Sequence, residues 1–207
     1  MISDLTVDLV VMRVIAGVIM ATVQGLAIAG TAVLLGDKGP RYDGRLTAWP
    51  WGHIDLLGLG SLALSGFGWG RSVAVDPAQL CFGRWGLVIV VLANCLALLV
   101  LGAVLPLLAA SLLRGLDYTA GVTVAAFLRE MAQLCVWMAV FSLLPIPPLA
   151  GAHFLTALGI SVPQRFAVYF GWALLLASVF GVTRAVLRPV FGLIAPLILG
   201  TDASALA

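Results

Sequence analysis

The sequence contains few side chains able to do chemistry, and its two histidines are the foremost of them. His53 forms a 53-HID-55 tripeptide with Asp55, and His153 follows the proline-rich stretch 145-PIPP-148. Imidazole titrates near neutral pH and is the commonest metal ligand. A histidine in a membrane segment is also a functional candidate by default. Two interpretations of His153 therefore stay open: a ligand of a metal site, or a structural hydrogen-bonding group.

The remaining reactive groups are one adjacent ion pair and three cysteines. Arg129 and Glu130 are neighbours in an apolar stretch, so on a helix they face different directions. They either pair with other segments or another subunit, or lie at the membrane interface. Cys81, Cys95 and Cys135 are odd in number, and at least two lie within apolar runs, which favours buried thiols over a disulfide framework.

The composition is that of an integral membrane protein. Of 207 residues, 62% are hydrophobic and 10% are charged, and the mean hydropathy is +1.15. Soluble domains have about 45–50% apolar and about 25% charged residues. A net charge of +2 provides no basic surface large enough for nucleic acid. We expect no cofactor, and we expect other integral membrane proteins and lipids as partners.

Apolar stretches long enough for membrane helices recur along the chain. A spanning helix needs about 20 apolar residues. Two shorter stretches, Leu56–Gly66 and Val190–Leu199, are expected to be re-entrant, interfacial or packed between helices. The predicted fold class is an all-α polytopic membrane protein with about 4–6 transmembrane or re-entrant helices and a short β-hairpin-like interfacial loop. The predicted spans are Leu5–Leu35, Gly86–Leu113, Thr119–Leu144 and Phe166–Leu187.

We expect one membrane domain over residues 1–207. Its parts are a first helix (5–35), an interfacial loop region (36–85), core helices with the PIPP break (86–160) and C-terminal helices (161–207). The loop region is rich in Gly, Pro and Trp and carries five of the eleven basic residues, which predicts a cytoplasmic loop and an outside N-terminus in a bacterial inner membrane.

Small residues recur every four positions along the first helix. This spacing places them in one stripe, where another backbone can approach closely, and so predicts a helix-packing face. The stripe consists of Gly17, Ala21, Gly25 and Ala29.

Several motifs together resemble the site-2 protease family of intramembrane zinc metalloproteases. That family has an H-E-x-x-H helix, a Gly-Asp, a GRLT-x-NP-x-x-HIDP loop, FGW, V-x-V-x-P, an A-G-P-x-x-N helix and N-x-x-P-I-P-P-L-D-G. The order and spacing agree over roughly residues 20–160. The matching segments are 35-LGD-37, 44-GRLTAWPWGHIDLLG-58, 67-FGWGRSVAVDP-77, 93-ANCLAL-98 and 142-SLLPIPPLAG-151.

The sequence departs from the family where the chemistry is expected. By the family's spacing, 24-QGLAI-28 replaces H-E-x-x-H, so that Gln24 and Ile28 stand for the histidines and Gly25 for the glutamate. Ala150 stands for the third ligand, the aspartate of L-D-G. Elsewhere, Ser142 replaces the asparagine before the prolines. In the A-G-P-x-x-N helix, Asn94, Cys95 and Leu98 replace Gly, Pro and Asn.

These replacements predict the loss of catalysis by the family mechanism. A catalytic zinc needs three protein ligands and an open water position. Ile28 and Ala150 cannot coordinate a metal, and Gln24 offers only a neutral amide. Without the glutamate no general base remains, and such proton transfer contributes about 10²–10⁴ in rate.

The leading hypothesis is a non-catalytic site-2-protease-like protein that serves as an accessory or assembly subunit of a larger membrane complex. The alternative is a pseudoprotease that holds transmembrane segments or lipids without cleavage. A metalloprotease with atypical ligands is the third possibility. Transport is disfavoured because no span pairs acids and bases along an ion path.

Overall fold

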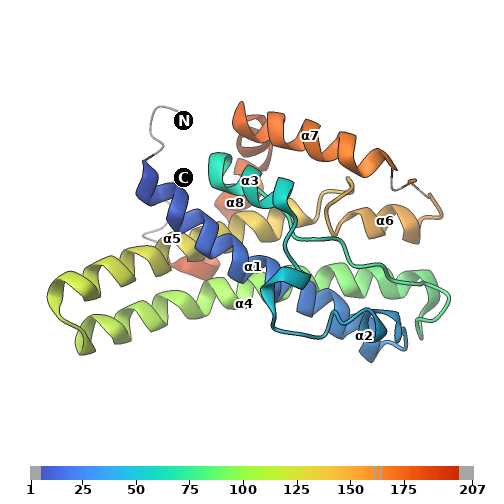
Figure 1. Cartoon of the computed structure of the whole chain (residues 1–207), viewed down its shortest axis with the longest axis horizontal. Helices are drawn as coiled ribbons and strands as arrows, with labels where there is room; N and C mark the ends of the chain where they lie inside the picture. Colours follow the sequence, from blue (N-terminus) through green and yellow to red (C-terminus); the bar gives the residue numbers. More distant parts are fainter. Residues whose placement is uncertain (1–5, 161, 164, 201–207) are drawn as a thin grey trace.

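The protein is helical along most of its length, as a computed structural model describes it for residues 6–160, 162–163 and 165–200 (Figure 1). The helices are α1 (Val7–Leu34), α2 (Gly39–Tyr42), α3 (Leu56–Ser65), α4 (Gly86–Gly115), α5 (Tyr118–Ser142), α6 (Ala152–Ala157), α7 (Arg165–Val179) and α8 (Val182–Leu199).

Four helices within the described ranges are long and apolar enough to cross a membrane: α1, α4 with the short turn that precedes it, α5 and α8. The first three coincide with predicted spans. The fourth predicted span, Phe166–Leu187, is wrong because the chain breaks at Gly181, whose φ is +80°. Glycine adopts this left-handed conformation readily. The break separates the 15-residue α7, which is short for a span, from α8, which absorbs the predicted piece Val190–Leu199.

The expected β-hairpin-like loop is reduced to a single antiparallel bridge between Ile54 and Gly70, and no strand forms in the described part of the chain. Glycine weakens strand pairing, and Gly52, Gly68 and Gly70 surround the bridge. The loop region instead crosses α1 as an extended chain, with α3 as its one long helix.

The centre of the molecule is an antiparallel pair, α4 and α5, crossed by α1 (Figure 1). Aromatic rings join α5 to its neighbours. Phe67, just after α3, makes edge contacts with Trp137 and Phe141 at centroid distances of 5.4 Å, and Trp137 stacks on Phe191 of α8 at 3.8 Å. Such pairs favour a fixed relative placement of helices.

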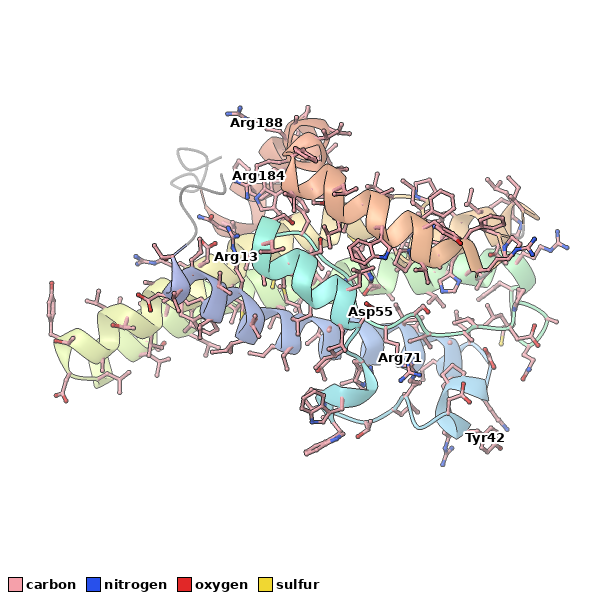
Figure 2. All side chains as sticks on the ribbon, turned by 45° about the horizontal axis from the view of Figure 1, so that its top comes forward. Arg13, Tyr42, Asp55, Arg71, Arg184 and Arg188 are labelled. Carbon is pink, nitrogen blue, oxygen red and sulfur yellow. The ribbon has the colours of Figure 1, made fainter. Side chains whose placement is uncertain are left out.

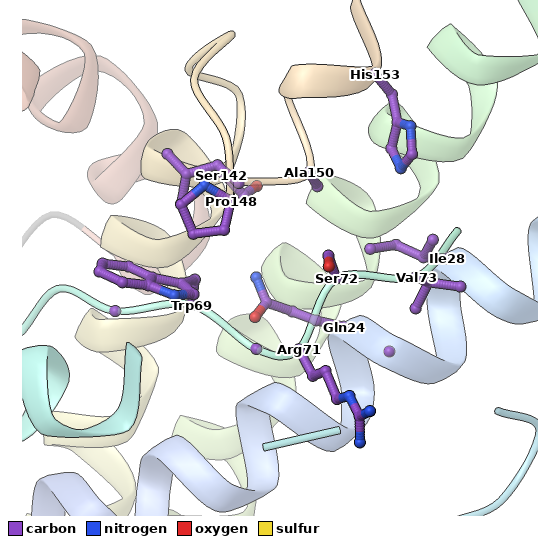
Figure 3. Close-up of a pocket in the computed structure, with 14 residues that line it drawn as sticks. Gln24, Ile28, Trp69, Arg71, Ser72, Val73, Ser142, Pro148, Ala150 and His153 are labelled. Atoms are coloured by element: carbon purple, nitrogen blue, oxygen red, sulfur yellow. The ribbon is translucent and has the colours of Figure 1, made fainter. Parts of the chain in front are cut away.

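The PIPP turn follows α5 directly and is closed by backbone hydrogen bonds. Gly151 N donates to Ser142 O at 2.7 Å, and Leu149 N donates to Ile146 O at 2.9 Å. A proline-broken backbone at membrane depth is tolerated where the surrounding protein satisfies its polar groups. The turn therefore returns the chain to α1, with Ala150 facing the middle of that helix (Figure 3).

Candidate functional site

The positions that the family uses for zinc lie together in one small pocket. Gln24, Gly25 and Ile28 of α1 line one side, and Ala150 and His153 line the other (Figure 3). The cavity volume is about 40 Å³. Since one water molecule needs about 10–15 Å³ of such volume, the pocket has room for a few waters and not for a peptide segment.

An extended segment and the end of α5 complete the pocket wall. Trp69, Ser72 and Val73 line it from the loop region, and Ser142 lines it from α5. Arg71 belongs to the same segment, but its guanidinium points away from Gln24 and Ala150 (Figure 3). Sequence reasoning did not connect this segment to the pocket, although its VAV alternation is the signal for an extended chain.

Gln24 is the most prominent polar side chain that α1 directs into the pocket. Its exposed fraction is 7%, and its amide forms no hydrogen bond with another described residue. A neutral amide of this kind is a weak zinc ligand beside imidazole or carboxylate. The side chain therefore occupies the position of the first family histidine without taking over its chemistry.

His53 fills the space beside Gly25, where the family's glutamate would begin. A Cβ atom added to Gly25 would overlap His53 Nδ1. The ring is fully buried, and its Nε2 lies 2.7 Å from the Thr47 carbonyl oxygen. Because a carbonyl only accepts, Nε2 carries a proton, and the buried Nδ1 has no hydrogen-bond partner among the described residues.

His153 is the only other histidine and belongs to α6, on the opposite side of the pocket. Burial lowers the pKa of its imidazole below 6.5, and a hydrogen bond with the Val73 backbone acts in the opposite direction. The ring is therefore mostly neutral at pH 7. The structure thus places the two histidines in different surroundings.

Ser142 and Asn94 form a buried polar pair between α5 and α4. Asn94 Nδ2 donates to Ser142 Oγ at 3.2 Å, and Ser142 Oγ donates to Ala139 O at 2.8 Å. Asn94 Oδ1 is buried and has no partner in the described chain. Both residues stand at positions where the sequence departs from the family, and their hydrogen bond links the two helices.

The loop residues shared with the family bind backbone groups. Asp37 is 1% exposed and accepts hydrogen bonds from Gly39 N and Asp76 N, each at 2.8 Å. Arg45 donates to the carbonyls of Gly52 and Ser72, the latter at 2.9 Å. Asp37 thus connects the two ends of the loop region, and Arg45 connects the loop to Ser72, which lines the pocket.

Asp55, the acid of the HID tripeptide, caps a helix. Its Oδ1 accepts a hydrogen bond from Gly58 N at 3.0 Å, and its backbone is extended, as is usual for an N-cap residue. The carboxylate thus caps the N-terminus of α3 and does not line the 40 Å³ pocket.

The small-residue stripe of α1 is buried along its whole length. A Cβ at Gly17 would meet the Leu59 and Leu62 side chains of α3 within 2.7 Å, and Gly25 meets His53. Ala29 packs in an apolar cluster with Val73. In this structure α3 and the loop region cover the stripe from Gly17 to Gly25, and Val90 of α4 joins the cluster around Ala29.

The residues present do not fit a catalytic zinc ion. In the described ranges, no group of three His, Cys, Asp or Glu side chains lies close enough to hold a metal. His53 is turned toward Gly25 and Thr47, and the ligand positions hold an amide and two alkyl side chains. No catalytic step through a metal can be built from this donor set.

Comparisons with known proteins agree with the motif resemblance. Over 141 residues, 67% of the chain, the sequence is 31% identical to a Bacillus subtilis (strain 168) protein named "Putative zinc metalloprotease YwhC". The match spans 64% of that relative's length. No family model matches the sequence, and no solved structure matches it significantly. With its four apolar helices and its GRLT, HID and PIPPL motifs, the chain is a site-2-protease-like membrane protein, and Gln24, Gly25, Ile28 and Ala150 stand at the positions that the motif spacing assigns to the zinc ligands and the glutamate.

Proposed function

We propose that this chain is a non-catalytic, site-2-protease-like membrane protein that acts as an accessory or assembly subunit of a larger membrane complex. It would lie in a bacterial inner membrane with its N-terminus outside, an orientation supported by the basic residues of the 36–85 loop region. Its partners would be other integral membrane proteins.

The observation that carries this proposal is the packing of His53 against Gly25. Position 25 carries no carboxylate, and any side chain there would overlap the buried His53 ring, which Thr47 holds in place. The surrounding loop keeps its hydrogen bonds. A pocket without the catalytic groups, inside a loop that keeps its hydrogen bonds, supports a role in which the fold and not catalysis is needed.

Purification from native membranes in mild detergent tests the proposed role. We expect the tagged chain to elute with other membrane proteins in fixed stoichiometry and at the size of a complex. A tagged membrane protein of similar abundance serves as the control for non-specific capture. Elution as a lone monomer, with the partners absent at every detergent concentration, would contradict the proposal.

A second cavity favours an alternative, a pseudoprotease that holds a peptide or lipid without cutting it. This cavity measures about 280 Å³ and adjoins the 40 Å³ pocket. It lies between the extended residues 72–75, Pro147 and α6, and His153 and Thr156 line it. Its size is near the lower limit of common ligand sites, about 300 Å³.

Photo-crosslinking separates the two functions. A photoreactive residue is placed at Thr156, in the larger cavity, and in a second variant at Gln24. A binding pseudoprotease predicts crosslinks from Thr156 to captured peptides or lipids. The accessory role predicts that Thr156 labels only the chain's own residues, while photoreactive groups on exposed helix positions label partner subunits.

A further inference from the structure

Two arginines from distant parts of the sequence converge beside the C-terminal end of α3. Arg13 lies in α1 and Arg184 lies at the start of α8 (Figure 2). Both approach Gly66, which ends α3. A Cβ built at Gly66 would lie 3.7 Å from Arg13 Nη2 and 3.7 Å from Arg184 Nη2. The two guanidinium groups therefore border the same small space.

Protein groups satisfy these guanidiniums only in part. Arg13 Nη1 donates to the carbonyls of Ala63 and Leu64 at 3.5 Å, the upper limit for a hydrogen bond. Arg184 lies over the Trp137 ring at 5.4 Å, a cation–π contact that holds it in place. The Nε atoms of both arginines are buried without a hydrogen-bond partner in the described residues.

The charges around this space leave a positive excess. Arg13 interacts with the carboxylate of Glu130 and with the like charge of Arg184. Among the described residues, one carboxylate faces the two guanidiniums, which leaves one positive charge there without compensation. Guanidinium groups are planar donors that suit phosphate oxygens, and two on one space can bind several oxygens of one phosphate.

The position of Arg13 along α1 favours the phosphate of a lipid headgroup as the ligand. Arg13 precedes Gln24 by eleven residues, about 16 Å along a helix axis. It lies in the second turn of a candidate spanning helix, where the hydrocarbon core gives way to headgroups. Exposed apolar side chains flank both arginines: Val11 and Ile15 on α1, and Val182 and Val186 on α8.

We propose that Arg13 and Arg184 form a binding site for the phosphate of an anionic membrane lipid. The guanidiniums bind the headgroup above Gly66, and the flanking apolar side chains of α1 and α8 contact the acyl chains. Basic pockets between membrane helices are suited to such headgroups. The site is separate from the degenerate zinc pocket, so its test is independent of the proposed accessory function.

The experiment measures the thermal stability of the full chain in detergent during titration with phosphatidylglycerol, phosphatidylcholine or inorganic phosphate. We expect phosphatidylglycerol to raise the melting temperature at concentrations at least tenfold lower than phosphatidylcholine. Inorganic phosphate should do so only weakly. The double variant Arg13→Gln/Arg184→Gln should lose this preference, whereas Arg114→Gln, at an exposed position in the last turn of α4, should keep it.

Three further tests keep the experiment decisive if the double variant is unstable. Arg13→Lys/Arg184→Lys retains the charges without the planar donors and should bind phosphatidylglycerol several-fold more weakly. Native mass spectrometry of the wild type should detect retained phosphatidylglycerol. Asp4→Asn/Asp202→Asn removes acids that lie outside the described residues, and it should leave the preference unchanged.

Several results would overturn the proposal. Equal effects of the two lipids, an unchanged preference in Arg13→Gln/Arg184→Gln, or a response to inorganic phosphate as strong as to lipid would each exclude a lipid site. A preference that is lost in Asp4→Asn/Asp202→Asn would show that charge elsewhere in the chain, and not the arginine pair, determines it. Loss of a protein partner in the glutamine variant, with no lipid preference in the wild type, would assign the arginines to a protein interface.

Discussion

The loop region and the degenerate zinc pocket adjoin each other but differ in what they retain. In the loop region, Asp37, Arg45 and Asp55 match family motifs, and each bonds to backbone groups. In the pocket, Gln24 and Ala150 stand at the positions that the motif spacing assigns to metal ligands; the Gln24 amide has no hydrogen-bond partner among the described residues, and Ala150 has no polar side-chain atom. The retained side chains are those that hold the fold, and the replaced ones are those whose chemistry the fold does not need.

His53 stands at the boundary between these two regions. It belongs to a retained motif and is held by Thr47 in the loop. Its ring also fills the space opened by the glycine at position 25. A buried polar network is stable only when its members remain paired. The comparison therefore predicts large effects where a side chain is paired or tightly packed, as at Asp37 and Gly25, and small effects at the unpaired Gln24.

The largest effect is expected from Asp37→Ala. The change removes two hydrogen bonds to a buried carboxylate and leaves Gly39 N and Asp76 N without that acceptor. We expect a loss of about 3 kcal/mol in the free energy of unfolding, measured by titration with SDS in mixed micelles. Asp43→Ala, at an exposed position of the same loop, is the matched control and should change stability by less than about 0.5 kcal/mol.

Gly25→Ala should have the next largest effect. The added methyl group overlaps the buried His53 ring, so we expect a loss of about 2 kcal/mol in the same measurement. Gly30→Ala is the control, because a Cβ there meets nothing within 4 Å, and it should be neutral or stabilising. In a double-mutant cycle, His53→Ala should recover at least about 1 kcal/mol of the Gly25→Ala cost. Strict additivity would show that the two residues do not compete for space.

Acidification should destabilise the protein through His153. Burial lowers the pKa of this imidazole from its ordinary value of 6.5, so the unfolded chain binds more protons than the folded one. The contribution to stability is full above pH 6.5 and is lost as the pH falls through the folded-state pKa. Unfolding curves between pH 8 and pH 5 should therefore be less pH-dependent for His153→Asn. An unchanged dependence in that variant would assign the effect to other groups.

Gln24→Met should have the smallest effect. Its amide bonds to no described residue, and methionine has a similar length. Replacing an unpaired buried polar group by an apolar one is close to neutral. We expect a change within about 0.5 kcal/mol, and a loss above about 2 kcal/mol would reveal a role for the amide that the pocket geometry does not show.

Sequence patterns predicted the spans whose boundaries coincide with α1, α4 and α5, because predominantly apolar stretches of more than 20 residues leave few alternatives in a membrane. The same patterns did not predict that the chain divides into α7 and α8 at Gly181. The chain contains 23 glycines, and their identity alone does not reveal which one adopts a positive φ. Hydropathy likewise treated Phe166–Leu187 as continuous.

The positions identified from the motif spacing all line one pocket: Gln24, Gly25, Ile28 and Ala150. The spacing could not indicate what replaced the lost side chains. The packing of His53 on Gly25 joins residues 28 positions apart, and it depends on how the loop folds back across α1. The convergence of Arg13 and Arg184 spans most of the chain and has no local signal. Both features arise from tertiary packing.

Metal content tests the central claim most directly. The chain is purified from native membranes without chelators, and bound zinc is quantified by inductively coupled plasma mass spectrometry beside that of the His153→Ala and His53→Ala variants. A degenerate pocket kept for shape predicts zinc far below one equivalent in all three proteins. One equivalent in the wild type, lost in either variant, would contradict it.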